Sequence, residues 1–184
     1  MHPEHLALLQ QAPASTHADD TWARLCCEQA LLAIEDGCYA VGALLVDGAG
    51  ELLCNGRNQV FAPAYASAAH AEMQVLDQLE SEHAQVDRRG LTLYVSLEPC
   101  LMCYGRILLA GIPRVRYLAR DRDGGFALRH GRLPPAWANL ASGACMVQAK
   151  VDPYWLDLAE RMIDRLQDRQ VLRQRVIQAW RGSR

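Results

Sequence analysis

Residues 97–110, "LEPCLMCYGRILLA", and residues 70–80, "HAEMQVLDQLE", each join potential metal ligands to an amphipathic helical pattern. Cys100 and Cys103 stand at the start of the first helical pattern, and His70 stands at the start of the second. A strand-like apolar run leads directly into the two cysteines. Both sets of ligands are therefore predicted at the amino ends of helices, and one set follows a buried strand.

The two cysteines and the histidine form a set of ligands that suits zinc. The partial positive charge of a helix amino terminus lowers the pKa of a nearby thiol and favours the thiolate that binds metal. Because Cys100 and Cys103 are three residues apart on one helical face, both sulfur atoms can reach the same ion. Three ligands leave the fourth zinc position for water, whose pKa the ion lowers toward neutrality. Glu72 lies two residues after His70, so we expect it to move protons at this water.

The composition predicts one domain over residues 1–184. Of these 184 residues, 51% are hydrophobic, which is enough for a sizeable core. The net charge of -2 gives no overall basic field for nucleic acid. The sequence has no apolar run of the length of a membrane-spanning helix and no secretory signal pattern at its start, so we expect a cytoplasmic protein with no membrane partner.

The seven cysteines are expected to be free thiols or metal ligands, because a reducing compartment does not preserve disulfides. Outside the C-x-x-C pair, the cysteines lie among apolar neighbours, and we expect small buried side chains there. These residues are Cys26, Cys27, Cys38, Cys54 and Cys145.

The apolar periodicity predicts the element order α-β-β-α-β-α-β-α-β-α, which is typical of an α/β fold with helices on both faces of one sheet. Asp19 or Asp20 can cap the first helix, which ends at Gly37. The "DGAG" turn at residues 47–50 predicts a hairpin between the first two strands. Two terminal segments are expected outside this alternation, a loosely held arm over residues 1–18 and a long C-terminal helical region over residues 153–180.

Three segments together resemble the cytidine-deaminase-like superfamily, in the branch of guanine deaminases, cytosine deaminases and tRNA adenosine deaminases. They are "HAE" (70–72), "LYVSLEPCLMC" (93–103) and "VGALLVDGAGELLCNGRN" (41–58). The combination of H-x-E with P-C-x-x-C is typical of zinc nucleobase deaminases. The resemblance implies a three-layer α/β/α fold with a central five-stranded mixed sheet, one zinc ion per chain and a homodimer.

The same resemblance implies roles for individual residues. The histidine and the two cysteines would bind zinc, and Glu72 would be the catalytic proton shuttle. Asn58 matches an asparagine that hydrogen-bonds the base, and Ala71 matches a residue whose backbone amide touches the ring. The expected reaction replaces an amino group on a nucleobase, nucleoside or related small heterocycle with a carbonyl and releases ammonia.

Two other classes of protein share part of this pattern. A thiol–disulfide oxidoreductase also has C-x-x-C at a helix start after a strand, but it leaves His70 and Glu72 without a role. A structural zinc-binding module needs a fourth ligand, which Cys54 or His83 can supply without characteristic spacing.

The expected substrate is a small molecule, and a tRNA-specific adenosine deaminase is the alternative. Residues 59–69 and the segments after residue 120 depart from the tRNA adenosine deaminase pattern. In those later segments, Phe126 and Trp137 are suited either to stacking on a base or to core packing. The C-terminal region favours the alternative through a stripe of arginines that can follow phosphates, although nearby aspartates equally predict an ion-paired, solvated face. The stripe consists of Arg161, Arg165, Arg169 and Arg173.

Overall fold

The computed structural model describes residues 1–127 and 133–182, and within them it contains one mixed sheet with the strand order β2-β1-β3-β4-β5. Strand β1 pairs antiparallel with β2 and β3, whereas β3, β4 and β5 run parallel. The expected five-stranded mixed sheet is confirmed. The strands are β1 (Gly42–Val46), β2 (Leu52–Arg57), β3 (Thr92–Leu97), β4 (Arg114–Ala119) and β5 (Cys145–Gln148).

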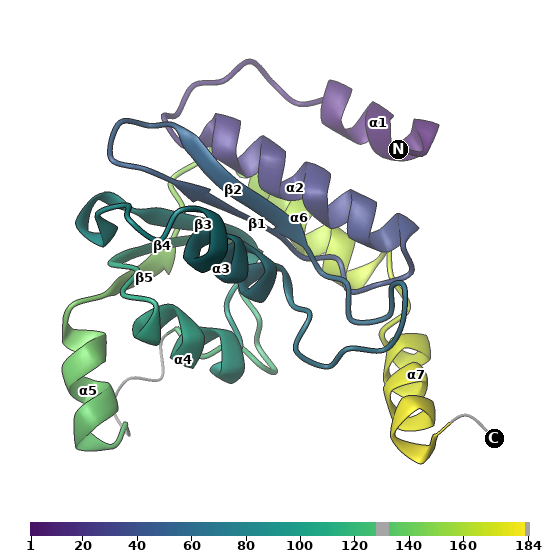
Figure 1. The fold of residues 1–184 in the computed structure, drawn as a ribbon. Coiled ribbons are helices and arrows are strands. Elements are labelled where there is room, and N and C mark those ends of the chain that lie inside the picture. The colour runs from purple at the N-terminus through teal and green to yellow at the C-terminus, as the bar shows by residue number, and fades with distance from the viewer. Residues whose placement is uncertain (128–132, 183–184) are drawn as a thin grey trace.

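Helices cover both faces of this sheet (Figure 1). α2 and α6 pack on one face, and α3 and α4 pack on the other, which is the expected three-layer arrangement. Within the described ranges, no helix is both long enough and apolar enough to cross a membrane. The helices are α1 (Pro3–Gln10), α2 (Asp20–Glu35), α3 (Ala71–Glu82), α4 (Leu101–Leu109), α5 (Pro135–Ser142), α6 (Pro153–Asp164) and α7 (Arg169–Arg181), with a short 3-10 turn η1 (Arg88–Gly90).

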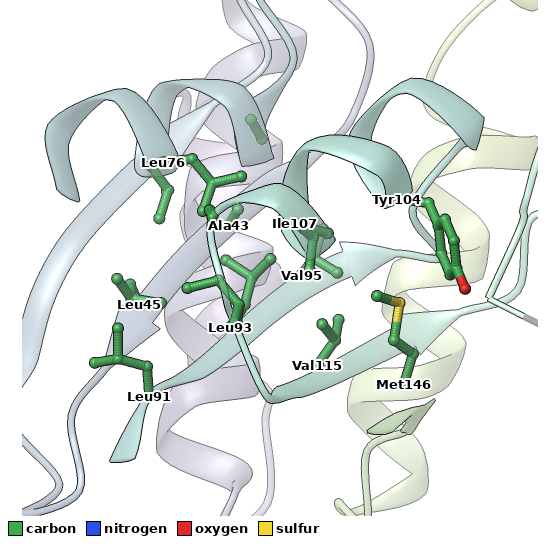
Figure 2. Packing of buried hydrophobic residues seen from close by; sticks show 14 of the residues in the cluster. Ala43, Leu45, Leu76, Leu91, Leu93, Val95, Tyr104, Ile107, Val115 and Met146 are labelled. Carbon is green, nitrogen blue, oxygen red and sulfur yellow. The ribbon is translucent and has the colours of Figure 1, made fainter. Parts of the chain in front are cut away.

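The alternation of side chains along the strands divides the core into two clusters. Leu45 of β1 and Leu93 of β3 belong to the cluster beneath α3 and α4, whereas Tyr94 belongs to the cluster beneath α2 and α6. Figure 2 shows the first cluster, in which Leu76 of α3 and Ile107 of α4 complete the packing. This apolar packing holds α3 and α4 against the same face of the sheet.

The predicted end of α2 at Gly37 and the predicted hairpin are confirmed, whereas the predicted capping of this helix by Asp19 or Asp20 is not. The Asp47 carboxylate accepts two backbone hydrogen bonds within the turn between β1 and β2. Gly37, just beyond α2, has a φ of 68°, a conformation that favours glycine at the end of a helix. Asp19 occupies the capping position of α2, but its carboxylate instead accepts a hydrogen bond of 2.7 Å from the Tyr94 hydroxyl.

Residues 1–18 are not the loosely held arm that we expected. They contain α1, which packs against α2 through Leu9, a residue that is 2% exposed (Figure 1). The Arg24 side chain donates a hydrogen bond of 2.8 Å to the Leu9 carbonyl, and the Tyr154 hydroxyl donates one to the Leu8 carbonyl. Because these contacts come from α2 and α6, the local sequence does not indicate them.

The C-terminal region is helical as predicted, but it consists of two helices and not of one continuous helix. α6 ends at Asp164, and α7 begins at Arg169. The Asp168 carboxylate accepts hydrogen bonds from the backbone N–H groups of Gln170 and Val171, at 2.9 and 3.1 Å. Such a cap begins a new helix and so interrupts the periodic pattern that spans both.

Four of the five cysteines outside the C-x-x-C pair are buried as expected, and Cys145 is the exception. Cys145 begins β5, which pairs with β4 alone and forms an edge of the sheet. Its apolar neighbours in the sequence therefore do not enclose it. All seven cysteines are free thiols.

Asp20 ties together three segments of the chain from a buried position. The residue is 2% exposed. Its Oδ2 accepts hydrogen bonds from the backbone N–H groups of Thr16 and His17, and its Oδ1 accepts one from Asp152, each at 2.8 Å. Burial alone raises the pKa of Asp20, but the hydrogen bonds outweigh it and the pKa is lowered.

Asp20→Ala is expected to lower the free energy of unfolding by about 1–3 kcal/mol, because buried N–H groups lose their acceptor. Urea denaturation measures this loss, and Asp20→Asn, which keeps one oxygen, should lose less. Folding lowers the pKa of Asp20. The contribution of its charge to the free energy of unfolding is therefore complete above the unfolded-state pKa, and it disappears as pH falls through the folded-state pKa. Equal stability of Asp20→Ala and the parent chain at neutral pH would contradict this role.

Candidate metal and catalytic site

The three predicted metal ligands lie where α3 and α4 begin. His70 precedes the first residue of α3, and Cys100 precedes the first residue of α4, both with extended backbone. Neither side chain caps its helix. Cys103 lies in the first turn of α4 and is fully buried. Because α3 and α4 pack on the same face of the sheet, their amino ends present these side chains to one another.

The distances between these side chains fit a zinc ion. The Cys103 Sγ lies 3.5 Å from the His70 Nδ1, and the Cys100 Sγ lies 3.8 Å from it. Tetrahedral bonds of about 2.0 Å to nitrogen and about 2.3 Å to sulfur separate such atoms by ~3.5 Å. All three ligand atoms lie within 4.8 Å of one another. They form the one such cluster of three or more potential ligands among the described residues.

The hydrogen bonds and charges around Cys100 and Cys103 favour a thiolate at one of these two cysteines before a metal binds. The hydrogen bond from Cys103, with a further contribution from His70, lowers the pKa of Cys100 to about 4. Cys103 donates in this pair, and so its own pKa is raised. Burial lowers the pKa of His70, but its hydrogen bond with Cys100 and the charge of Glu72 raise it overall.

Glu72 stands beside the cluster without belonging to it. The residue lies in the first turn of α3, and it is 3% exposed. Burial raises the pKa of its carboxyl group above the usual range. A carboxyl group with a raised pKa is suited to both accepting and donating a proton near neutral pH.

A cavity of about 340 Å³ opens next to the ligands. His70, Cys100, Glu72 and Asn58 all line it. Asn58 is 2% exposed, and its Oδ1 accepts a hydrogen bond of 3.1 Å from the Val60 N–H, which orients the side-chain amide. Four of the six predicted site residues therefore meet at one cavity.

The other two predicted site residues do not line this cavity. Cys103 belongs to the ligand cluster, and Ala71 packs in the core. Ala71 is the first residue of α3, and N–H groups in a first helical turn lack a partner within the helix. Its backbone amide therefore remains suited to a ligand.

Several lining residues were not predicted from the sequence. Glu98, which we did not select, lines the cavity while its Oε1 accepts a hydrogen bond of 3.1 Å from the Ala127 N–H. Others come from loops, from the end of β3 and from the C-terminal helices, which carry no local motif for a site. They are Tyr39, Val41, Val60, Tyr65, Ser67, Leu97, Asp121, Ile163, Gln167, Arg169 and Val176.

Neither Phe126 nor Trp137 lines the cavity, so the stacking role considered for them is wrong. The Phe126 ring packs edge-on against Tyr104, with 5.1 Å between centroids, and Trp137 lies over Gly105 of α4. The neighbouring residues 128–132 of the same segment lie outside the described ranges.

The positions of these residues also test the two alternative classes, a thiol–disulfide oxidoreductase and a structural zinc-binding module. His70 and Glu72 share one site with the C-x-x-C pair, an arrangement that a thiol–disulfide exchange enzyme does not need. In the described chain, neither Cys54 nor His83 joins the three ligands, which removes the expected fourth ligand of a structural zinc module. A zinc site with three protein ligands remains.

Residues 16–119, more than half of the chain, match the family model described as the cytidine and deoxycytidylate deaminase zinc-binding region. The chain belongs to this family. Zinc is therefore the metal that suits the His70–Cys100–Cys103 cluster.

Two sequence relatives and two solved structures extend the comparison. The tRNA-specific adenosine deaminase of Bacillus subtilis is 36% identical over 107 residues, which cover 58% of this chain and 65% of that protein. The tRNA-specific adenosine deaminase 2 of Xenopus laevis is 34% identical over 117 residues, covering 60% and 66%. The chain thus matches just under two thirds of the length of each relative.

The solved structures match a larger share of their own chains. One, from a study of A-to-I editing by tRNA:A34 deaminases, has a TM-score of 0.57 at 31% identity and covers 62% of this chain and 89% of that one. The guanine deaminase from Nitrosomonas europaea has a TM-score of 0.62 at 22% identity and covers 88% and 93%. The latter likeness concerns the fold.

Cys103→Ala is expected to reduce the zinc content of the purified protein from about one ion per chain to near zero, because two ligands do not hold the ion. Elemental analysis measures the metal, and Cys54→Ala, at another buried cysteine, should keep it. A well-folded, metal-free parent protein with a Cys100–Cys103 disulfide would contradict the zinc site and favour thiol–disulfide chemistry.

Proposed function

We propose that the protein is a zinc-dependent hydrolytic deaminase that converts the amino group of a small heterocycle to a carbonyl. The observation that carries this proposal is the meeting of Glu72 and Asn58 with the ligand cluster at one cavity. Cavities of about 300–1,000 Å³ are typical for small molecules. The cavity of about 340 Å³ falls at the lower end of this range.

The roles of the residues follow from their positions. His70, Cys100 and Cys103 hold the zinc, which when bound activates the attacking water as a Lewis acid. Glu72 accepts one proton from this water and delivers it to the ring nitrogen, and it then carries the second proton, from the added hydroxyl group, to the departing amine. The exocyclic C–N bond breaks, the oxygen of water forms the new C=O bond, and ammonia leaves. Asn58 orients the heterocycle through its fixed amide.

A small substrate is supported by how the cavity is covered. Ile163 of α6, Gln167 of the link after α6 and Val176 of α7 line the cavity together with the metal ligands. A nucleotide within a folded RNA would have to pass between this cover and the metal ligands. The sequence matches to the tRNA-specific deaminases extend over at most two thirds of this chain.

The second candidate is a tRNA-specific adenosine deaminase, which the names of the sequence relatives favour. The arginine stripe gives it less support than expected, because Arg165 and Arg169 stand on either side of a helix break. Arg161 pairs with Asp157, and Arg169 pairs with Asp123, at 3.3 and 3.4 Å. The Arg161–Asp157 pair matches the ion-paired face that the nearby aspartates predicted, whereas Asp123 is a partner distant in the sequence.

Ammonia release from a panel of free bases, nucleosides and aminopterins tests the proposed function directly. At least one compound should be deaminated, and Glu72→Ala should lower kcat by about 10²–10⁴-fold because the proton shuttle is gone. Zinc content and thermal stability should stay close to those of the parent protein, since Glu72 does not bind the ion.

Glu82→Ala is the matched control, because Glu82 is an exposed carboxylate at the other end of the same helix. Full activity of Glu72→Ala would remove the proposed mechanism. Inosine formation in a tRNA anticodon stem-loop, with no turnover of any panel compound, would instead establish the second candidate.

We also propose that the protein forms a homodimer through the outer surface of α4 and α5. Leu101 and Leu109 of α4 are 60% and 64% exposed, and Met102 is 39% exposed. Beside them, Trp137 of α5 helps to line an apolar hollow of about 500 Å³. Clustered exposed apolar side chains are typical of protein interfaces, and a second copy of the chain is the partner that the family resemblance implies.

Leu109→Glu is expected to shift the protein from dimer to monomer, because it places charge in the centre of the apolar surface. Light scattering coupled to size-exclusion chromatography measures the mass in solution. Leu6→Glu makes the same change at a leucine of α1 that is 44% exposed on the opposite layer, and it should leave the dimer intact. An active parent protein that is monomeric at assay concentration would contradict the proposed dimer.

A further inference from the structure

The C-terminal helix α7 contributes to the cavity although it stands apart from both helical layers (Figure 1). Arg169 in its first turn and Val176 in its middle line the cavity that holds the predicted metal ligands. The short link from α6 includes Gln167, whose Oε1 accepts a hydrogen bond of 2.9 Å from the Ala40 N–H. This bond fixes the point from which α7 extends over the cavity.

Arg175 makes two contacts between α7 and the body of the protein. Its guanidinium lies over the Phe61 ring, 4.1 Å from the ring centroid, and donates a hydrogen bond to the Gly37 carbonyl. Phe61 belongs to the loop over residues 59–69, which also supplies cavity-lining side chains such as Tyr65. Arg175 therefore joins α7 to the loop that supplies Tyr65 to the cavity.

A second contact joins the same two segments further along α7. The Trp180 indole N–H donates a hydrogen bond of 3.1 Å to the Tyr65 hydroxyl. The rings of Phe61 and Tyr65 are themselves stacked at a tilt, with 6.0 Å between centroids. The loop and the helix thus meet along a row of aromatic side chains at the rim of the cavity.

Apolar packing adds little to this attachment. Leu172 is the one residue of α7 that is fully buried. A hollow of about 840 Å³ remains between the helix and the loop, lined by Phe61, Arg175 and their neighbours. Residues 169–184 also contain five arginines and no acidic residue, so the segment itself offers them no acidic partner. Segments with few buried apolar contacts open locally more easily than the core does.

We propose that α7 is a cover over the cavity, held closed by Arg175, and that it sets the upper size of compounds that reach the metal-ligand cluster. One consequence of this inference, the selection of small heterocycles over larger nucleic acid substrates, rests on the proposed function. The cover itself does not. The closed position leaves a cavity of about 340 Å³, and opening α7 removes one of its walls.

The test compares zinc transfer from the full-length, zinc-loaded protein to two chelators of different size. Dipicolinate has a single ring, and pyridylazoresorcinol has two linked rings. Arg175→Ala should raise the transfer rate to the larger chelator roughly five- to tenfold more than to the smaller one, as expected for loss of a partly buried cation–π contact. Trp180→Ala, which removes the second contact, should change the ratio in the same direction.

Arg173→Ala is the control, because Arg173 is an exposed arginine two residues away on the same helix and does not line the cavity. Its ratio of transfer rates should equal that of the parent. Since both chelators are anions, this variant also accounts for the loss of one positive charge. An unchanged ratio in Arg175→Ala and Trp180→Ala would overturn the cover, whatever the protein deaminates.

Ammonia release gives a second readout that separates the cover from the proposed function. Arg175→Ala should raise kcat/KM for nucleosides relative to free bases by a similar factor, whereas Arg173→Ala should not. A changed chelator ratio without ammonia release from any compound would refute the deaminase and keep the cover. A changed ratio with unaltered substrate preference in an active enzyme would overturn the role of α7 in selection.

Discussion

The meeting of two helix amino ends at one small volume is the constraint on which the rest of the structure depends. His70, Cys100 and Cys103 have to place one nitrogen and two sulfur atoms within 4.8 Å of one another. Only rigid elements achieve this, because an error of about 1 Å in their positions would spoil the coordination geometry. The apolar cluster beneath α3 and α4 supplies that rigidity.

The same arrangement also creates the chemistry of the site. Burial raises the pKa of Glu72, whereas the hydrogen bond from Cys103 lowers the pKa of Cys100 to about 4. The pKa values of two acidic groups within one site are thus shifted in opposite directions. The shift suits Glu72 to proton transfer and Cys100 to metal binding. The helix amino ends add their partial positive charge on the side of the thiolate.

The cavity combines two parts of the chain with different origins. Its floor comes from residues 16–119, the range that matches the family model. Its cover comes from α6, α7 and the link between them, which lie beyond that range. In our proposal, the floor carries the reaction class and the cover limits which compounds enter.

The sequence by itself determined the metal ligands, the hairpin and the order of the strands and of the helices between them, because each depends on spacing within a short segment. The two C-x-x-C sulfurs, the turn at Asp47 and the end of α2 at Gly37 are all local features. Only the tertiary structure decided where α1 and α7 lie, since their anchors are tens of residues or more away in the sequence. Leu8 is held by Tyr154, and Arg175 is held by Gly37 and Phe61, partners that no periodic pattern indicates. The exposure of Cys145 was likewise decided by its place on an edge strand.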